Sequence, residues 1–250
     1  MAVGQLADAY ADPDLGAFDL GFLEDGVQVR RSLAACWGVR FEQAAPVRRF
    51  RWSKGGKSFA GWYFCATTGE HIGYESWLER DRLILLDADP QVTGIASQPF
   101  WLHWHDGERR RRHAPDYFVR LANSRGRVVD VRAADRVDEA AAEAFAATER
   151  ACRAVDWEFV WADVPDPVLM ANMRWLSRYR RQRCLRRDVT DRLMEVFSEP
   201  RPLRPGAEEA GDPLMVLPVL FHLLWSGVLV TDVASRLLGS DSVVHMARMR

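Results

Sequence analysis

The sequence almost lacks lysine. Lys54 and Lys57 are its only lysines among 34 basic residues, so arginine carries nearly all of the positive charge. Each arginine at a candidate site therefore has to be weighed against a preference that runs through the whole chain. The formal net charge is -1, which is typical of a globular protein. At 250 residues the chain is long enough for a sizeable core and for two small domains.

The sequence also lacks a cysteine cluster. Its four cysteines form no CxxC pair and no Cys/His group, which argues against a structural zinc site. We therefore expect buried, reduced thiols in a cytoplasmic protein. The residues concerned are Cys36, Cys65, Cys152 and Cys184.

No segment has the character of a membrane span or of a signal peptide. The N-terminus has no basic region followed by an apolar stretch. Residues 214–230 form the most apolar run, but Pro218 and Gly227 interrupt it, and it is slightly short for a span. We predict a buried helix followed by a strand in this run, and no membrane partner.

Charge is unevenly distributed along the chain. No basic residue precedes Arg30, so residues 1–45 are expected to form an acidic arm followed by a short helix or strand. Two basic runs, residues 109–112 and 174–187, compensate for this arm. The acidic residues of the arm are Asp8, Asp12, Asp14, Asp19, Glu24 and Asp25.

The middle of the chain predicts an α+β domain over residues 46–166. Periodicity and turn residues indicate a hairpin, a helix, several strands, a long alanine-rich helix and a final strand. In this order the last helix and strand form a crossover onto the sheet. The expected segments are a hairpin at 57–76 turning at Thr68-Gly69, a helix at 74–90, a strand at 92–104, a turn at Asp106-Gly107, strands within 112–135, a helix at 137–155 and a strand at 157–165.

A second domain is expected over residues 167–250, after the Pro165-Asp166-Pro167 boundary. Its pattern of helix, short strand, threonine-capped helix and short strand indicates a winged-helix or helix-turn-helix unit, although another small helical domain could give a similar pattern. The expected segments are an arginine-rich helix at 173–187, a helix at 188–197, a loop at 198–213, a helix at 217–227, a strand at 228–230, a helix at 231–239 and a strand at 240–244.

Two aspartates occupy the strands on either side of the turn-rich NSRG segment. Aspartate is depleted in strands and costly to bury without a partner, so Asp116 and Asp130 need an explanation. A two-residue turn would place them on opposite faces, whereas a three-residue turn with Gly126 as the left-handed residue would place them on the same face. Arg132 shares a face with Asp130 because side chains alternate along a strand. Two converging carboxylates repel each other unless a cation such as Mg²⁺ lies between them.

Glu79 is a third acid, on the predicted helix that precedes these strands. An isolated helical glutamate usually lies on a solvated face, here with a weak pair to Arg82. Because Glu79 precedes a Pro-Asp pair and an Asp-x-Arg triplet, the solvated-face interpretation weakens and a position in the same site as the two aspartates is favoured.

The ordered set of Glu79, Pro115-Asp116 and Asp130-Val131-Arg132 resembles the restriction-endonuclease-like nuclease core with its PD-(D/E)xK motif. More narrowly, residues 46–165 resemble TnsA-like transposase endonucleases, through YESWLERDRL, the IASQPFWL strand, APDYFV and RVVDVR. The resemblance implies that Glu79, Asp116 and Asp130 bind one or two Mg²⁺ or Mn²⁺ ions, with the Val131 carbonyl as a further ligand.

The same resemblance implies a function. It is that of the DNA endonuclease subunit of a heteromeric transposase, which hydrolyses phosphodiester bonds at transposon ends. The implied partners are double-stranded DNA, an integrase-type transposase subunit and an AAA+ ATPase regulator, with the C-terminal domain as a docking surface for the regulator or for DNA. Arg132 stands where the motif normally has lysine, and arginine does not give up its proton. A catalytically degenerate protein that only binds DNA or assembles with partners is therefore the alternative.

Both basic runs have two interpretations. Arg109, Arg110, Arg111 and Arg112 are either a solvated turn or contacts to DNA phosphates. Arg174, Arg178 and Arg181 alternate with Trp175 and Tyr179, which suits nucleic acid but also an amphipathic helix with inward aromatic rings. For His103, His105 and His113, surface roles or DNA contact are expected rather than a transition-metal site.

Overall fold

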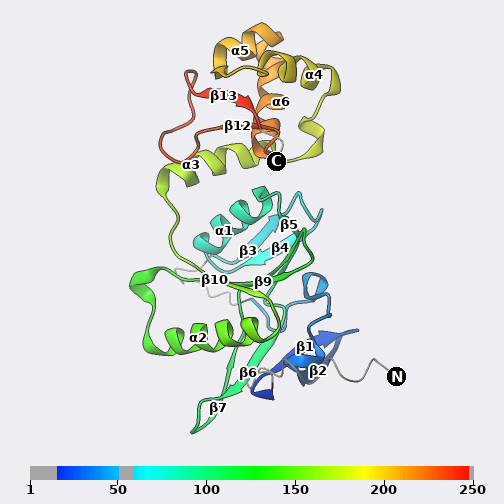
Figure 1. Cartoon of the computed structure of the whole chain (residues 1–250), viewed down its shortest axis with the longest axis vertical. Coiled ribbons are helices and arrows are strands. Elements are labelled where there is room, and N and C mark those ends of the chain that lie inside the picture. The colour runs from blue at the N-terminus through cyan, green and yellow to red at the C-terminus, as the bar shows by residue number, and fades with distance from the viewer. Residues whose placement is uncertain (1–15, 51–58, 248–250) are drawn as a thin grey trace, which may run out of the picture. The chain divides into compact units, whose positions relative to one another are not determined.

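The computed structural model describes residues 16–50 and 59–247 and shows, within them, an α+β protein with four sheets and six α-helices (Figure 1). The predicted α+β class is confirmed. The chain divides into two compact units. The first contains the described residues up to Phe64 together with His71–Arg80 and Gln91–Val164, and the second contains Cys65–Glu70, Asp81–Pro90 and the residues from Pro165 onward.

A four-stranded mixed sheet forms the centre of the first unit. Three successive strands are antiparallel neighbours. The fourth strand, at one edge of the sheet, is parallel to its neighbour and is connected to it by a helical crossover. The crossover helix is α2 (Glu139–Ala154), which starts where the Asp138 carboxylate accepts a hydrogen bond from Ala141 N and then packs on β9 and β10 (Figure 1). The predicted crossover is therefore confirmed. In sheet order the strands are β10 (Glu158–Ala162), β9 (Gly126–Val131), β8 (Tyr117–Leu121) and β5 (Val92–Ser97).

A second four-stranded sheet contains the N-terminal segment. Residues 1–15 of the expected acidic arm lie outside the described residues. In residues 16–45 the structure differs from the expectation, because they contribute two strands and several buried side chains, among them Phe18, Leu20 and Phe22. Acidic charge on these strands is balanced locally, since Arg30 Nε and Nη2 bind Asp19 Oδ2 at 2.9 and 2.8 Å. The strand order is β2 (Val27–Ser32), β1 (Asp19–Glu24), β6 (Trp101–His105) and β7 (Arg110–His113).

The single strand expected at 92–104 is divided between the two sheets. β5 ends at Ser97 and β6 begins at Trp101, and Gln98 between them has a left-handed backbone with φ 47°. The turn expected at Asp106-Gly107 lies one residue further along, since Asp106 N donates to Arg109 O and Gly107-Glu108 form the tip, with φ 103° at Gly107.

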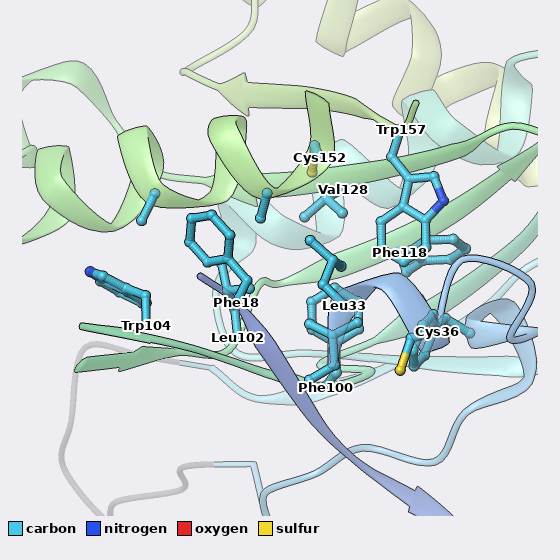
Figure 2. Packing of buried hydrophobic residues seen from close by; sticks show 14 of the residues in the cluster. Phe18, Leu33, Cys36, Phe100, Leu102, Trp104, Phe118, Val128, Cys152 and Trp157 are labelled. Carbon is cyan, nitrogen blue, oxygen red and sulfur yellow. The ribbon is translucent and has the colours of Figure 1, made fainter. Parts of the chain in front are cut away.

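Aromatic rings join the two sheets into one core (Figure 2). Phe41 lies at their centre, with its ring centroid 4.9 Å from that of Phe100, 5.6 Å from Phe118 and 5.8 Å from Trp157. Such edge-to-face contacts add to the free energy gained by burying the rings. Figure 2 shows Cys152 of α2 above Val128 of β9 in the same cluster.

A short hairpin and a helix complete the first part of the chain. β3 (Gly61–Phe64) pairs with β4 (His71–Tyr74), and the connection contains Gly69 with φ 73°, at the predicted turn. Residues 57 and 58, which the prediction included, lie outside the described residues. α1 (Trp77–Ala88) confirms the helix expected at 74–90.

The second unit contains four helices and a three-stranded sheet in its C-terminal part. The apolar run folds as predicted, because helix α6 is buried over most of its last three turns and strand β12 follows it. No described helix has both the length and the apolar character required to cross a membrane. The elements are α3 (Pro167–Leu176), α4 (Arg187–Val196), β11 (Arg201–Pro202), α5 (Leu203–Ala210), α6 (Pro213–Trp225), β12 (Leu229–Thr231) and β13 (Val243–Met246), with sheet order β11-β13-β12.

Three predictions for this region are wrong. The arginine-rich run is not one helix, since α3 ends at Leu176 and two 3₁₀ turns follow, Ser177–Tyr179 and Gln182–Cys184. The expected loop at 198–213 contains β11 and α5, and the Phe197 ring packs against the backbone of α5 at Gly206, where a Cβ would not fit. The helix expected at 231–239 does not form.

Only a turn forms at the start of this segment. The Asp232 carboxylate accepts hydrogen bonds from Ala234 N and Ser235 N, and the carbonyls of Val233 and Arg236 accept from the side chain of Asn172 and not from later residues of a helix. The cysteines are free thiols; three are buried and Cys184 is half-buried.

Candidate active site

The turn between β8 and β9 places the two aspartates on one face. Leu121 N donates to Arg125 O at 3.0 Å, which encloses a three-residue loop, as the same-face alternative requires. The left-handed residue of this loop is Ser124, with φ 68°, and not Gly126. Tyr117 pairs with Val129, and this register carried one residue further puts Asp116 opposite Asp130.

Hydrogen bonds connect these two aspartates. Val131 N donates to Asp116 Oδ2 at 2.7 Å, and Asp116 N donates to Asp130 Oδ1 at 3.3 Å. Asp130 is buried with 2% of its surface exposed. Burial, followed by the negative charges of Asp130 and Glu79, raises the pKa of Asp116 well above its usual value. The pair therefore lies in an environment with too little positive charge for its carboxylates.

Glu79 belongs to a capping box at the start of α1. Ser76 Oγ accepts a hydrogen bond from Glu79 N at 3.1 Å, while Glu79 Oε2 accepts one from Glu75 N at 2.7 Å. Ser76 Oγ also lies 2.9 Å from Glu79 Oε1, to which it can donate. Glu79 is thus buried, and burial raises its pKa, so the solvated face with an Arg82 pair is not what forms. The S-x-x-E spacing in the sequence could have indicated this cap.

His113 is a partner of Asp130 that sequence reasoning missed. Its Nε2 lies 2.9 Å from Asp130 Oδ1 and 3.0 Å from Asp130 Oδ2, so a single ring nitrogen faces both carboxylate oxygens. His113 ends β7 and Asp130 lies in β9, so the contact requires two different sheets to meet. No spacing in the sequence indicates it. His103 and His105 do not join this contact; His105 Nδ1 instead accepts from Gly107 N.

Arg48 is the second residue that sequence reasoning missed. Its Nη1 and Nη2 each lie 2.8 Å from one oxygen of Glu75, in a two-pronged ion pair that is mostly buried. The positive charge of Arg48 lowers the pKa of both Asp116 and Glu79, in opposition to the effect of burial.

These groups line a pocket of about 390 Å³ in the first unit. Arg132 lies at its edge with 44% of its side chain exposed, and its nearest acid is Asp138, at 3.7 Å. Arg112 also borders the pocket and stacks 4.4 Å above the Trp101 ring. The lining residues are Arg48, Glu75, Glu79, Trp101, Arg112, His113, Ala114, Asp116, Asp130, Val131, Arg132 and Phe145.

Arg112 alone of the 109–112 run lines this pocket. Arg109 and Arg111 pair with Asp106 inside their own hairpin, and Arg111 also pairs with Glu143 at 3.1 Å. Arg110 lies on β7 with its side chain exposed.

The other predicted DNA contacts belong to the second unit. Arg174 is in an ion pair with the buried Asp81, and Arg178 lies 5.1 Å above the Trp175 ring. Trp175 and Tyr179 contact Phe221 of α6, with ring centroids 5.9 and 4.9 Å away, while 41% of Trp175 remains exposed. Arg181 immediately precedes the second 3₁₀ turn.

The oxygen ligands in the pocket are of the kind that binds a hard divalent cation, but they are not arranged as a complete metal site. Asp116, Asp130, Glu79 and the Val131 carbonyl offer oxygen ligands of the kind that Mg²⁺ and Mn²⁺ prefer. Within the described residues, however, no group of three or more His, Cys, Asp and Glu residues is arranged to hold a metal ion. Glu79 is engaged in the helix cap, and the carboxylate of Asp130 lies against His113 Nε2.

A scan against protein-family models finds none that matches this chain, and a search of the curated proteins finds no match either. The chemistry of the pocket is therefore inferred from its own residues. Carboxylates that can hold a metal ion, surrounded by arginines, suit the hydrolysis of a phosphate ester.

Proposed function

We propose that the chain is the metal-dependent DNA endonuclease subunit of a heteromeric transposase and hydrolyses phosphodiester bonds at transposon ends. One observation carries the nuclease part: Asp116 and Asp130 converge on one face of the central sheet, beside Glu79, in a pocket bordered by arginines. The raised pKa of Asp116 supports it, since the site has a deficit of positive charge that a divalent ion would fill.

The connectivity of the first unit also supports the proposal. Helix α1 is followed by β5, β8 and β9 as antiparallel neighbours, then by α2 and by β10 parallel to β9. Within this order α1, β8, β9, α2 and β10 follow the helix, strand, strand, helix, strand order that the restriction-endonuclease-like and TnsA-like resemblance implies, with β5 as an additional strand. Asp116 immediately precedes β8 and Asp130 lies in β9, as the PD-(D/E)xK motif requires.

Each residue of the pocket then has a role. Asp116, Asp130 and the Val131 carbonyl would hold Mg²⁺ or Mn²⁺, with Glu79 as the further acid. The bound ion would neutralise phosphate charge and lower the pKa of the attacking water. Val131 N fixes one oxygen of Asp116, and His113 orients the carboxylate of Asp130. Arg132 does not give up its proton, so it would serve as a fixed positive charge at the edge of the pocket.

The second unit supports a role in assembly. The order α4, β11, α5, α6, β12 and β13, with β13 between the other two strands, is compatible with a winged-helix unit, although the threonine-capped helix on which that prediction relied does not form. Helix α6 would be the recognition helix of such a unit, but its sequence has no arginine or lysine and most of it is buried. Docking of the AAA+ ATPase regulator therefore suits this unit better than base reading.

The test is cleavage of a supercoiled plasmid that carries transposon ends, with the integrase-type subunit and the ATPase present. We expect nicking that requires Mg²⁺ or Mn²⁺ and that falls by about 100-fold or more in Asp116→Ala and Asp130→Ala, because each removes a metal ligand. The control is Asp135→Ala, an exposed acid outside the pocket, which should cleave normally. Equal nicking by the aspartate variants and the wild type would refute the proposal.

A second candidate function is supported by two observations. The described residues contain no assembled metal group, and arginine replaces the lysine of the motif. A degenerate nuclease that only binds DNA or assembles with partners would have both features. Tight binding to duplex DNA without any cleavage, with all partners present, would establish this alternative.

A further inference from the structure

Arg48 is the positively charged group held most firmly inside the pocket. Its side chain is 23% exposed, compared with 44% for Arg132 at the edge. Glu75 occupies one edge of the planar guanidinium through two hydrogen bonds of 2.8 Å. A guanidinium has five N–H donors, so this pair leaves others that can bind an anion in the pocket.

The partner of Arg48 is itself fixed to the acid site. Glu75 immediately precedes the cap of α1, and its backbone N–H donates to Glu79 Oε2 at 2.7 Å. Arg48 is thus linked to Glu79 through Glu75: its guanidinium binds the Glu75 carboxylate, and the backbone N–H of Glu75 binds the Glu79 carboxylate. Movement of Arg48 away from the pocket would break an ion pair that is largely shielded from water.

Gln98 links the backbone next to Arg48 to that of Asp116. Gln98 O accepts from Val47 N at 2.9 Å, and Gln98 N donates to Asp116 O at 2.8 Å. Gln98 is 1% exposed and has φ 47°, a left-handed conformation that costs a residue other than glycine about 1 kcal/mol or more. The surrounding structure maintains this strained residue at the point where the segment of Arg48 meets the metal-ligand candidate.

The arginine of the motif is placed differently. Arg132 has no partner closer than Asp138 at 3.7 Å among the ion pairs of the described residues, and about half of its side chain is open to solvent. Arg112 is exposed and stacked on Trp101. Neither is fixed by a two-pronged hydrogen-bonded partner as Arg48 is.

We propose that Arg48 binds the phosphate that is cleaved. It thereby supplies, from outside the motif, a positive charge inside the pocket, whereas Arg132, at the lysine position of the motif, lies only at the edge of the pocket. The ligand class is a phosphodiester of the DNA backbone, and the inference rests on the nuclease function proposed above. Because the guanidinium is fixed before DNA arrives, little reorganisation is needed when charge develops on the phosphate.

The first test is the salt dependence of binding between the full-length protein and a fluorescent duplex, measured with Ca²⁺ in place of Mg²⁺. Neutralising one phosphate contributes about 0.9 to the slope of log K against log salt concentration. Replacing Arg48 alone would remove the two-pronged ion pair from the Glu75 carboxylate, so the decisive variant is Arg48→Gln combined with Glu75→Gln. We expect its slope to be smaller than that of the wild type by about 1, whereas Arg48→Lys keeps the slope.

The second readout is the rate of cleavage. In the double variant kcat should fall by about 100-fold with a smaller change in KM, because a prearranged charge stabilises the transition state more than the bound substrate. Arg48→Lys should lose about 10-fold in kcat, since lysine keeps the charge but not the planar fork. The control is Arg153→Ala, an exposed arginine on α2 that pairs with Glu149 at 3.4 Å and lies outside the pocket.

The outcomes separate the two proposals. If the wild type cleaves DNA and Asp116→Ala does not, but the double variant keeps the wild-type slope and kcat, the role of Arg48 is refuted while the nuclease function stands. If Arg132→Ala rather than the double variant loses the slope and the rate, the phosphate-binding residue is Arg132. If the wild type does not cleave, the nuclease proposal fails, and the role of Arg48 fails with it.

Discussion

The carboxylate of Asp116 shows most clearly how the site conflicts with stability. It accepts a hydrogen bond from Val131 N, which favours the ionised form, but burial and the charges of Asp130 and Glu79 act in the opposite direction and prevail. The folded protein thus holds this group at a pKa above that of an unfolded chain. Such a conflict between charge and burial is common where a site is built for a ligand and not for stability.

Asp116→Asn should therefore stabilise the metal-free protein. Asparagine can accept the same hydrogen bond through its Oδ1, but it adds no charge. The folded pKa of Asp116 is raised, so its contribution to stability is complete below the unfolded value of about 3.9 and is lost as the pH rises through the folded value. We expect a gain of about 1 kcal/mol, or about 2–4 °C in Tm, at pH 8, with no gain at low pH.

The measurement is a series of thermal melts in EDTA from pH 4 to pH 8. Asp135→Asn is the control, because Asp135 is exposed and lies outside the pocket. Added Mg²⁺ should raise the Tm of the wild type but not that of Asp116→Asn. A variant that is less stable than the wild type at pH 8 would contradict the electrostatic account.

At the scale of elements, one face of β9 contributes both to the pocket and to the aromatic core. Asp130 at its C-terminal end faces the pocket, whereas Gly126 at its N-terminal end faces the aromatic core. A Cβ at Gly126 would lie 2.7 Å from Phe118 Cζ and 2.9 Å from Trp157 Cδ1. The sequence offered this glycine as a turn residue, but close packing against rings is the reason for it.

Gly126→Ala should destabilise the protein by about 1–3 kcal/mol, because the rings of Phe118 and Trp157 would have to move apart in a packed core. Urea denaturation followed by circular dichroism measures the loss. Gly38→Ala is the matched control, since a Cβ there meets nothing within 4 Å. Equal stability of the two variants would show that β9 can shift without cost.

At the scale of the whole molecule, α1 contributes to both units. Its first residues belong to the unit with the pocket, while Asp81–Pro90 belong to the unit that contains α3 to α6. Within the second unit the Asp81 carboxylate, 6% exposed, is in an ion pair with Arg174 of α3. An arginine that the sequence offered as a DNA contact is thus the partner of a buried acid.

Arg174→Met should lower stability by about 1–3 kcal/mol, because the buried Asp81 carboxylate would lose its ion pair with Arg174. The cost is below that of a fully buried pair since Arg174 is half-exposed. Adding Asp81→Asn should recover much of the loss, and the salt dependence of DNA binding should not change in either variant. Arg204→Ala, which breaks an exposed pair with Glu208, is the control and should cost little. A reduced salt dependence of DNA binding in Arg174→Met would show that Arg174 contacts DNA after all.

The sequence by itself determined the elements whose causes are local. Helical periodicity located α1 and α2, and the apolar run located α6 and β12. The NSRG segment allowed the three-residue turn, and this turn length places Asp116 and Asp130 on one face. Side-chain alternation and turn geometry act over a few residues, so these features can be deduced from a short stretch of chain.

Only the tertiary structure decided which charges meet. His113 lies 17 residues from Asp130, Arg48 lies 27 from Glu75 and Arg174 lies 93 from Asp81. Phe18, Leu20 and Phe22, in the segment expected to be an acidic arm, belong to the core, and the arginine-rich run breaks into two 3₁₀ turns, neither of which local composition indicates. Ion pairs in a weakly hydrated interior depend on distance and shielding, and the folded chain alone sets both.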